Sequence, residues 1–419
     1  MRFIFVILCM ILSFSPVVWS EEFKVKGLIK THTNIDTYGA ASVMDMVGDE
    51  EAKIEARVLS RIMVEGQAAY STFLYVHYEN SFSKGEYFSA LDALEGNAWQ
   101  VVKLSTDNSK DDTQLFSLTQ GYLDANGEEA YHRLDRLYFR YTLPHSEIRF
   151  GRQAVQWGRG ILFEAADFIN PYEPTNNMRD YREGRDMLLL RWQGYVFSDI
   201  QFITVPGRNP DSRDIETSWS AFLLRLHEQM ENASVSIYGG GYYGDPVAGF
   251  GVSFTYGDGH VRADAVVGYG QEKDYVTAVL NADYEWLFLD RAVTGFVEFY
   301  YDSLGVDSVQ AADRSRELSE KLESGYISLR DRYYSAIGLK YLPVNKIRLF
   351  ISYIYNVRDN SSIVQPKIEW DFKDNLLVSV GADLPAGRLE TEFGGFYDEV
   401  GRQIVTPAKR VYGQVTLKF

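Results

Sequence analysis

The chain ends at Arg410–Phe419 with the stretch RVYGQVTLKF, whose residues alternate in polarity. One face carries Val411, Gly413, Val415, Leu417 and Phe419, and the other carries Tyr412, Gln414, Thr416 and Lys418. A period of two is that of a β-strand with one apolar face. On the edge of a soluble sheet the terminal aromatic ring would be exposed. In a closed barrel within a bilayer the strand pairs on both sides and its apolar face meets lipid. The stretch therefore predicts a transmembrane β-barrel.

Segments of about ten residues with alternating polarity recur along the chain, as in transmembrane barrels. Eighteen strands are predicted, at 23–35, 52–64, 68–80, 132–143, 147–157, 185–196, 199–206, 217–228, 232–243, 249–256, 260–270, 275–287, 292–303, 332–342, 346–357, 362–372, 375–384 and 409–419. Short links rich in turn residues alternate with long links such as 81–131. The predicted fold is all-β, an antiparallel barrel with short periplasmic turns and long extracellular loops, and sixteen strands is the alternative count.

Residues 1–20 predict a cleaved secretory signal peptide, because Arg2 is followed by a short apolar run and small residues precede Glu21. A membrane anchor is the alternative, but the run is short for a span. The only cysteine, Cys9, lies in this segment, so residues 21–419 offer no thiolate metal site and no cofactor is expected. The net charge of −16 argues against a nucleic-acid partner. Since no linker divides residues 21–419, they are predicted to form a single barrel.

Charged residues in the predicted strands are expected to face the lumen, because a charge on the lipid face at mid-depth costs roughly 2–4 kcal/mol. The predicted pore-lining bases are Arg57, Arg61, Arg136, Arg140, Arg191, Arg225, Lys340 and Arg348, and the inward acids are Glu55, Asp264, Asp283, Glu298 and Glu369. Basic and acidic arcs that face each other across the lumen would orient polar solutes at a constriction. The alternative is charge pairs between neighbouring strands that satisfy a polar interior.

The most unusual stretch runs from Gly151 to Asp186 and contains GRQAVQWGRG, ADFINPYEP and RDYREGRD. Its turn formers and clustered charges predict that residues 158–184 fold into the lumen as a constriction loop, and an ordinary external loop is the alternative. Its candidate residues are Arg152, Trp157, Asp167, Asn170, Arg179, Arg182 and Arg185. Trp157 is expected to anchor the base of the loop at the outer interface of the membrane.

The same stretch carries a resemblance to known proteins. An Arg-Gln strand end, a Trp-Gly pair, the Asp-x-x-Asn-Pro pattern at 167–171 and an arginine-rich return resemble several families of Gram-negative outer-membrane barrels. The eighteen-stranded alginate-export porins are the best-understood relatives in style. That resemblance implies an arginine-lined lumen that passes an anionic polysaccharide, although the acids of the later strands argue against a strictly anionic route. The Phe419 ending resembles the signature that the barrel-assembly machinery recognises.

These features predict a porin-like outer-membrane channel for passive diffusion or export of small hydrophilic solutes, anionic ones among them. None of the six histidines lies in a G-x-S-x-G or H-E-x-x-H setting, so an enzyme is not expected. The alternatives are a structural barrel that sheathes or scaffolds a polymer-export or electron-transfer partner, and a barrel enzyme. The expected partners are outer-membrane lipid, lipopolysaccharide and the barrel-assembly machinery, and a homo-oligomer is left open.

Overall fold

The computed structural model describes residues 23–39, 42, 52–85, 111–125, 127–169, 181–194, 197–210, 212–270, 273–306, 329–397 and 404–419. Of the features predicted above, the signal peptide at 1–20 lies outside these residues, as do Asn170 and Arg179. No helix in the described ranges is long and apolar enough to cross a membrane.

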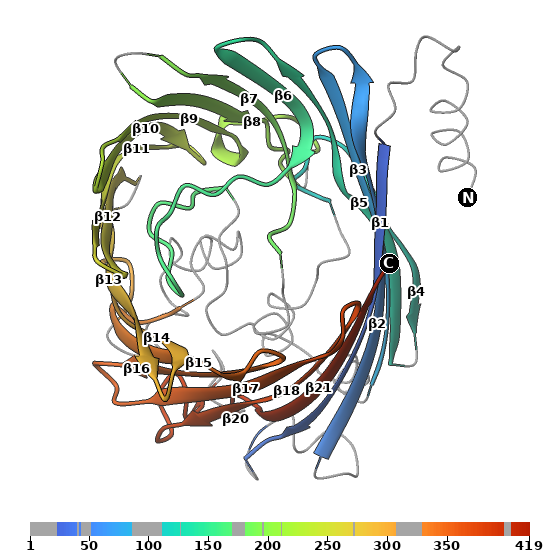
Figure 1. Cartoon of the computed structure of the whole chain (residues 1–419), viewed down its shortest axis with the longest axis vertical. Coiled ribbons are helices and arrows are strands. Elements are labelled where there is room, and N and C mark those ends of the chain that lie inside the picture. The colour runs from blue at the N-terminus through green and yellow to red at the C-terminus, as the bar shows by residue number, and fades with distance from the viewer. Residues whose placement is uncertain are drawn as a thin grey trace.

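In these ranges, nineteen strands make one antiparallel sheet, and eighteen of them close into a ring (Figure 1). The ring strands are β1 (Phe23–Thr37), β2 (Ala52–Ala69), β3 (Thr72–Gly85), β5 (Glu128–Thr142), β6 (Ser146–Gln153), β7 (Arg185–Trp192), β8 (Asp199–Val205), β9 (Ala221–Gln229), β10 (Ala233–Tyr242), β11 (Asp245–Tyr256), β12 (Gly259–Tyr269), β13 (Asp274–Phe288), β14 (Arg291–Asp302), β15 (Tyr333–Val344), β16 (Ile347–Asn356), β17 (Ser362–Lys373), β18 (Leu376–Ala386) and β21 (Lys409–Lys418). The ring closes where β21 pairs with β1 in the register Leu28↔Lys418 to Thr37↔Lys409.

The nineteenth strand, β4 (Thr119–Ala125), pairs with the first half of β5 and lies outside the ring order. A short hairpin of β19 (Phe396–Tyr397) with β20 (Ile404–Val405) and a 3₁₀ turn, η1 (Thr217–Trp219), complete the described elements. Each of the eighteen predicted strands overlaps one ring strand, so the predicted fold and count are confirmed, and the sixteen-strand alternative is wrong. The prediction missed β4, which it placed within a long link.

Turns of two residues join several strand pairs at one end of the barrel, for example at 257–258 and 289–290, and we call this the short-turn end. The segment between β6 and β7 belongs to the opposite, long-loop end. Three connections at the long-loop end are shorter than the predicted pattern, namely those at 243–244, 270–273 and 357–361.

Side-chain alternation divides the wall into two faces. Large apolar side chains such as Ile337, 56% exposed, and Phe299, 52% exposed, cover the outer face, as expected for a surface that meets lipid. In the last strand Val411 points outward, whereas Tyr412 is buried on the inner side. The stretch Arg410–Phe419 therefore has the two faces that its alternating polarity predicted.

Strand β5 interrupts the alternation near its middle. The register shifts where His77 pairs with Arg136 and the next residue, Tyr78, pairs with Leu134. This bulge places the consecutive side chains of Asp135 and Arg136 on the luminal side, where they form an ion pair of 2.7 Å. The bulge thus supplies a buried carboxylate to the lumen at a position that simple alternation assigns to lipid.

Candidate functional site

Residues 154–169, here called the inner segment, follow β6 and run inside the ring of strands (Figure 1). Arg159 attaches this segment to β12. Its backbone N–H donates to Asp264 Oδ2 at 2.7 Å, and its guanidinium Nη1 donates to Asp264 Oδ1 at 3.0 Å. Tyr238 on β10 receives a second bond from the same guanidinium at 2.8 Å. One arginine therefore fixes the inner segment to two strands of the wall.

A second attachment is made by Glu298 on β14, whose carboxylate is fully buried. It accepts backbone N–H groups from Ile161, Leu162 and Phe163 at 2.6, 2.8 and 2.7 Å. Hydrogen bonds from backbone N–H groups to an ionised carboxylate are shorter and stronger than neutral ones. The predicted inward acids Asp264 and Glu298 thus hold the inner segment against the wall.

Apolar packing supports both attachments. Trp157 is 4% exposed, stacks on Tyr238 with ring centroids 5.9 Å apart, and donates from Nε1 to Gln201 at 2.8 Å. Phe163 packs between Tyr300 and Tyr334. The expectation that Trp157 anchors the loop at the outer interface is wrong, because its ring lies in a buried cluster inside the barrel. Here the indole is satisfied by an aromatic neighbour and an amide instead of by the membrane surface.

Residues 181–184, here called the return segment, lead back to β7 and contact the opposite arc of the wall. The guanidinium carbon of Arg61 lies 3.7 Å from the ring centroid of Tyr181. The hydroxyl of Tyr181 donates a hydrogen bond to Glu79. The N–H of Gly184 donates to Asp135 Oδ1 at 3.2 Å, and Arg136 donates to the carbonyl of Arg182 at 2.5 Å. The predicted inward arginines of β2 and β5 therefore hold the return segment.

Arg182 joins the two segments to each other. Its guanidinium forms an ion pair with Glu164 at 2.6 Å and a second one with Asp167. Burial raises the pKa of Glu164 from 4.5 to about 7, although the ion pair with Arg182 acts in the opposite direction. Glu164 Oε1 accepts from Arg182, whereas the buried Oε2 has no hydrogen-bond partner. This carboxyl therefore has a pKa close to neutral pH.

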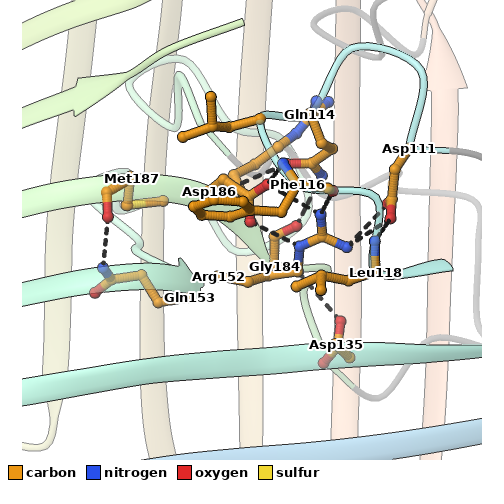
Figure 2. A network of polar contacts seen from close by, with 12 residues as sticks. Asp111, Gln114, Phe116, Leu118, Asp135, Arg152, Gln153, Gly184, Asp186 and Met187 are labelled. Carbon is orange, nitrogen blue, oxygen red and sulfur yellow. Dashed lines mark hydrogen bonds and ion pairs between the residues drawn. The ribbon is translucent and has the colours of Figure 1, made fainter. Parts of the chain in front are cut away.

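Arg152, at the end of β6, is the centre of a further network (Figure 2). It pairs with Asp186 on β7 at 2.9 Å, with Asp111 at 2.9 Å, and donates to the carbonyl of Phe116 at 2.6 Å. The neighbouring Arg185 donates to Thr113 at 3.2 Å. Residues 111–118 are thus tied to the root of the inner segment. The sequence analysis missed this contact, because residues 111–118 show no periodicity. The one signal in the sequence was the charge of Arg152 at a strand end, which requires a carboxylate partner when it is buried.

The other predicted pore-lining charges form pairs across neighbouring strands or within one strand. Arg57 contacts Glu55, Arg140 contacts Glu147, Arg191 contacts Asp199, Arg348 contacts Glu369 and Asp371, and Asp283 contacts Arg262 and His260. Arg225 instead donates to the hydroxyl of Ser236 at 3.3 Å, and the ammonium of Lys340 lies 5.9 Å from the ring centroid of Phe350. Most inward bases therefore have a carboxylate as a fixed neighbour.

A cavity of about 480 Å³ opens beneath the inner segment. Its lining is Gln156, Gly158, Arg159, Gly160 and Ile161 of the inner segment and Ser253, Arg262, Asp283, Thr294 and Phe296 of β11 to β14. Arg262 and Thr294 are each the fourth residue after a short turn, so the cavity faces the short-turn end. Within the described residues, no group of three or more His, Cys, Asp or Glu side chains is arranged to hold a metal ion.

Comparison of the sequence with known protein families and with curated proteins finds no match. Solved structures do match over nearly the whole chain. OccAB1 of Acinetobacter baumannii has a TM-score of 0.52 at 9% identity, covering 97% of this chain and 98% of that chain. A BenF-like porin from Pseudomonas fluorescens Pf-5 has a TM-score of 0.53 at 7% identity, with coverages of 96% and 99%. OccK5 (OpdH) of Pseudomonas aeruginosa gives 0.52 at 10% identity, with coverages of 94% and 98%. The chain therefore has the fold of these porin structures, a closed antiparallel barrel of eighteen strands.

Proposed function

We propose that the protein is a porin-like channel of the bacterial outer membrane that lets small hydrophilic solutes pass by diffusion. The observation that carries the proposal is a polar lumen, inside an apolar outer wall, that is crossed by a segment docked on Asp264 and Glu298. A barrel of this strand number encloses more space than its own side chains fill. A docked segment reduces that space to a defined passage.

The same contacts support a constriction role for residues 158–184. Attachment through backbone N–H groups fixes the position of the chain more firmly than side-chain contacts alone, because it leaves few dihedral angles free. The polar lining near Arg159 then forms the narrow part of the route. Passage through it requires no energy source, and no catalytic step is part of the proposal.

The proposal includes a location and an orientation. The exposed apolar belt would contact outer-membrane lipid, with the short-turn end in the periplasm and the long loops near lipopolysaccharide. Residues 1–20 would serve as the export signal. The C-terminal strand, with Phe419 bonded to Gly27 at 2.7 and 2.9 Å at the ring closure, would be the element that the assembly machinery receives.

Single-channel recording in planar bilayers tests the proposal. Folded protein, identified by the altered gel mobility of unheated barrels, is expected to insert and produce discrete conductance steps. Liposomes that contain the protein are expected to swell in isosmotic solutions of small sugars. Folded protein that inserts without any conductance above background would contradict the channel, and it would instead favour a barrel that sheathes a partner.

A further inference from the structure

Each positive charge at the cavity beneath the inner segment is paired with a carboxylate. Three charged side chains line it, namely Arg159, Arg262 and Asp283. Asp283 forms an ion pair with Arg262. Asp264, which is not part of the lining, forms an ion pair with Arg159 at 3.0 Å. The exposed Glu285 accepts a hydrogen bond from Thr294 at 3.3 Å and adds a third carboxylate at the margin of the cavity. Neither guanidinium is therefore available to a solute without competition from a carboxylate.

The pairing continues along the wall toward the short-turn end. Arg348 contacts Glu369 at 2.9 Å, and Arg149 contacts Glu147 at 2.6 Å. An anion that entered from this side would have to displace a carboxylate from each of these guanidinium groups. Among the described residues, Arg225 instead donates to the hydroxyl of Ser236, and the ammonium of Lys340 lies 5.9 Å from the ring centroid of Phe350. Most positive charges along the described part of this wall therefore have a carboxylate partner.

The remaining lining is neutral and mixed in character. Gln156 supplies an amide, Ser253 and Thr294 supply hydroxyl groups, and Phe296 supplies an aromatic ring. Amide and hydroxyl groups both donate and accept hydrogen bonds, so they match the hydroxyl groups of a solute in either direction. An aromatic ring offers an apolar face for the C–H groups of the same solute. Ligand cavities commonly measure about 300–1,000 Å³, so a cavity of 480 Å³ admits a small sugar.

We propose that this cavity is a binding subsite for neutral, hydroxyl-rich solutes of monosaccharide to disaccharide size. The inference rests on the proposed channel function and specifies its substrate class. In the subsite the ring of Phe296 faces the carbon skeleton of the solute. The paired Arg262 and Asp283, held in place by each other, bond to adjacent hydroxyl groups, with Ser253 and Thr294 completing the set.

The test compares three solutes with the same carbon skeleton and different charges, namely glucose, gluconate and glucosamine. Swelling of liposomes that contain the full protein is expected to be several-fold faster with glucose than with gluconate or glucosamine. In a KCl gradient across a planar bilayer, the reversal potential is expected to lie near zero. Glucose added to the bilayer chamber is expected to reduce the ionic current in a saturable manner.

Two substitutions and a matched control assign the effect to the cavity. Phe296→Ala is expected to weaken the saturable current block by glucose at least several-fold. Asp283→Asn removes the carboxylate partner of Arg262, and it is expected to shift the swelling preference toward gluconate. Phe299→Ala removes the same ring from the same strand on the outer face, where Phe299 is 52% exposed, and it is expected to leave glucose binding unchanged. Gel mobility of unheated samples shows that each variant is folded.

The outcomes separate this inference from the channel proposal. Absence of conductance and of swelling with every solute would overturn both. Normal conductance with faster swelling in gluconate or glucosamine than in glucose would overturn the substrate class and leave the channel standing. The same conclusion would follow if Phe296→Ala and Phe299→Ala bound glucose equally well.

Discussion

Replacing Glu298 with glutamine should release the inner segment from the barrel wall. In the structure the two carboxylate oxygens accept three backbone N–H groups, from Ile161, Leu162 and Phe163. Glutamine can keep its accepting oxygen where the N–H groups of Leu162 and Phe163 meet, but it then turns its NH₂ group toward the N–H of Ile161, so one bond is lost and the other two reach a neutral oxygen. The lost bond to the charged group costs about 1.5–3 kcal/mol, and each of the two that become neutral weakens by about 1 kcal/mol, so the docked state loses at least about 3 kcal/mol.

A loss of this size shifts the ratio of docked to undocked segment by about two orders of magnitude, because 1.4 kcal/mol is tenfold. Single-channel recordings of Glu298→Gln are therefore expected to show a larger mean conductance and more frequent transitions than the wild type. Glu369→Gln is the matched control, since it also removes an inward acid but one that pairs with Arg348 and Lys367. A folded Glu298→Gln channel with wild-type conductance and transitions would refute the docking role of these bonds.

Four further predictions concern the docked segment, its root and the outer wall. Burial raises the pKa of Glu164 from 4.5 to about 7, so its contribution to the stability of the docked state is complete below pH 4.5 and is lost as the pH rises through 7. Conductance should therefore increase between pH 5 and 8. Recordings of Glu164→Gln should show no such change. Gly251→Val should also raise conductance, because its Cβ would overlap Asp264 and Arg159. Arg152→Ala leaves two buried carboxylates unpaired at a cost of about 3–5 kcal/mol, and limited proteolysis should then cleave residues 111–118 faster. Ile337→Arg, on the lipid face, should lower the free energy of unfolding in vesicles by roughly 2–4 kcal/mol, measured by urea titration.

The strands of the wall were predictable because each repeats the same physical requirement along its length. Every ring strand has one face toward lipid, so polarity alternates and marks the strand even without neighbours. Strand β4 was missed because its register shifts between Gly121 and Leu123, which breaks the period of two within only seven residues. The bulge at Asp135 was missed for the same reason, since the pattern carries no sign of which residue is inserted.

The inner segment was predictable as an unusual stretch, but its contacts were not. Arg159 and Asp264 are separated by 105 residues, and no spacing in the sequence relates them. Trp157 shows the limit most clearly, because an indole at a membrane interface and an indole packed on Tyr238 come from the same sequence context. Composition and turn residues indicate that a loop is ordered, whereas only the closed ring determines which side chains lie opposite it.

The closed ring also gives a physical reason for the uneven distribution of inward charge along the chain. Acids of β12 and β14 receive the N–H groups and the guanidinium of the inner segment. Arginines of β2 and β5 receive the carbonyl and aromatic groups of the return segment. These two arcs lie on opposite sides of the ring (Figure 1). Because Arg182 joins the two segments, attachment to both arcs fixes them across the lumen, and many of the inward charges position the chain. The proposed channel would therefore select by the shape and hydrogen bonding of its passage more than by a field across it.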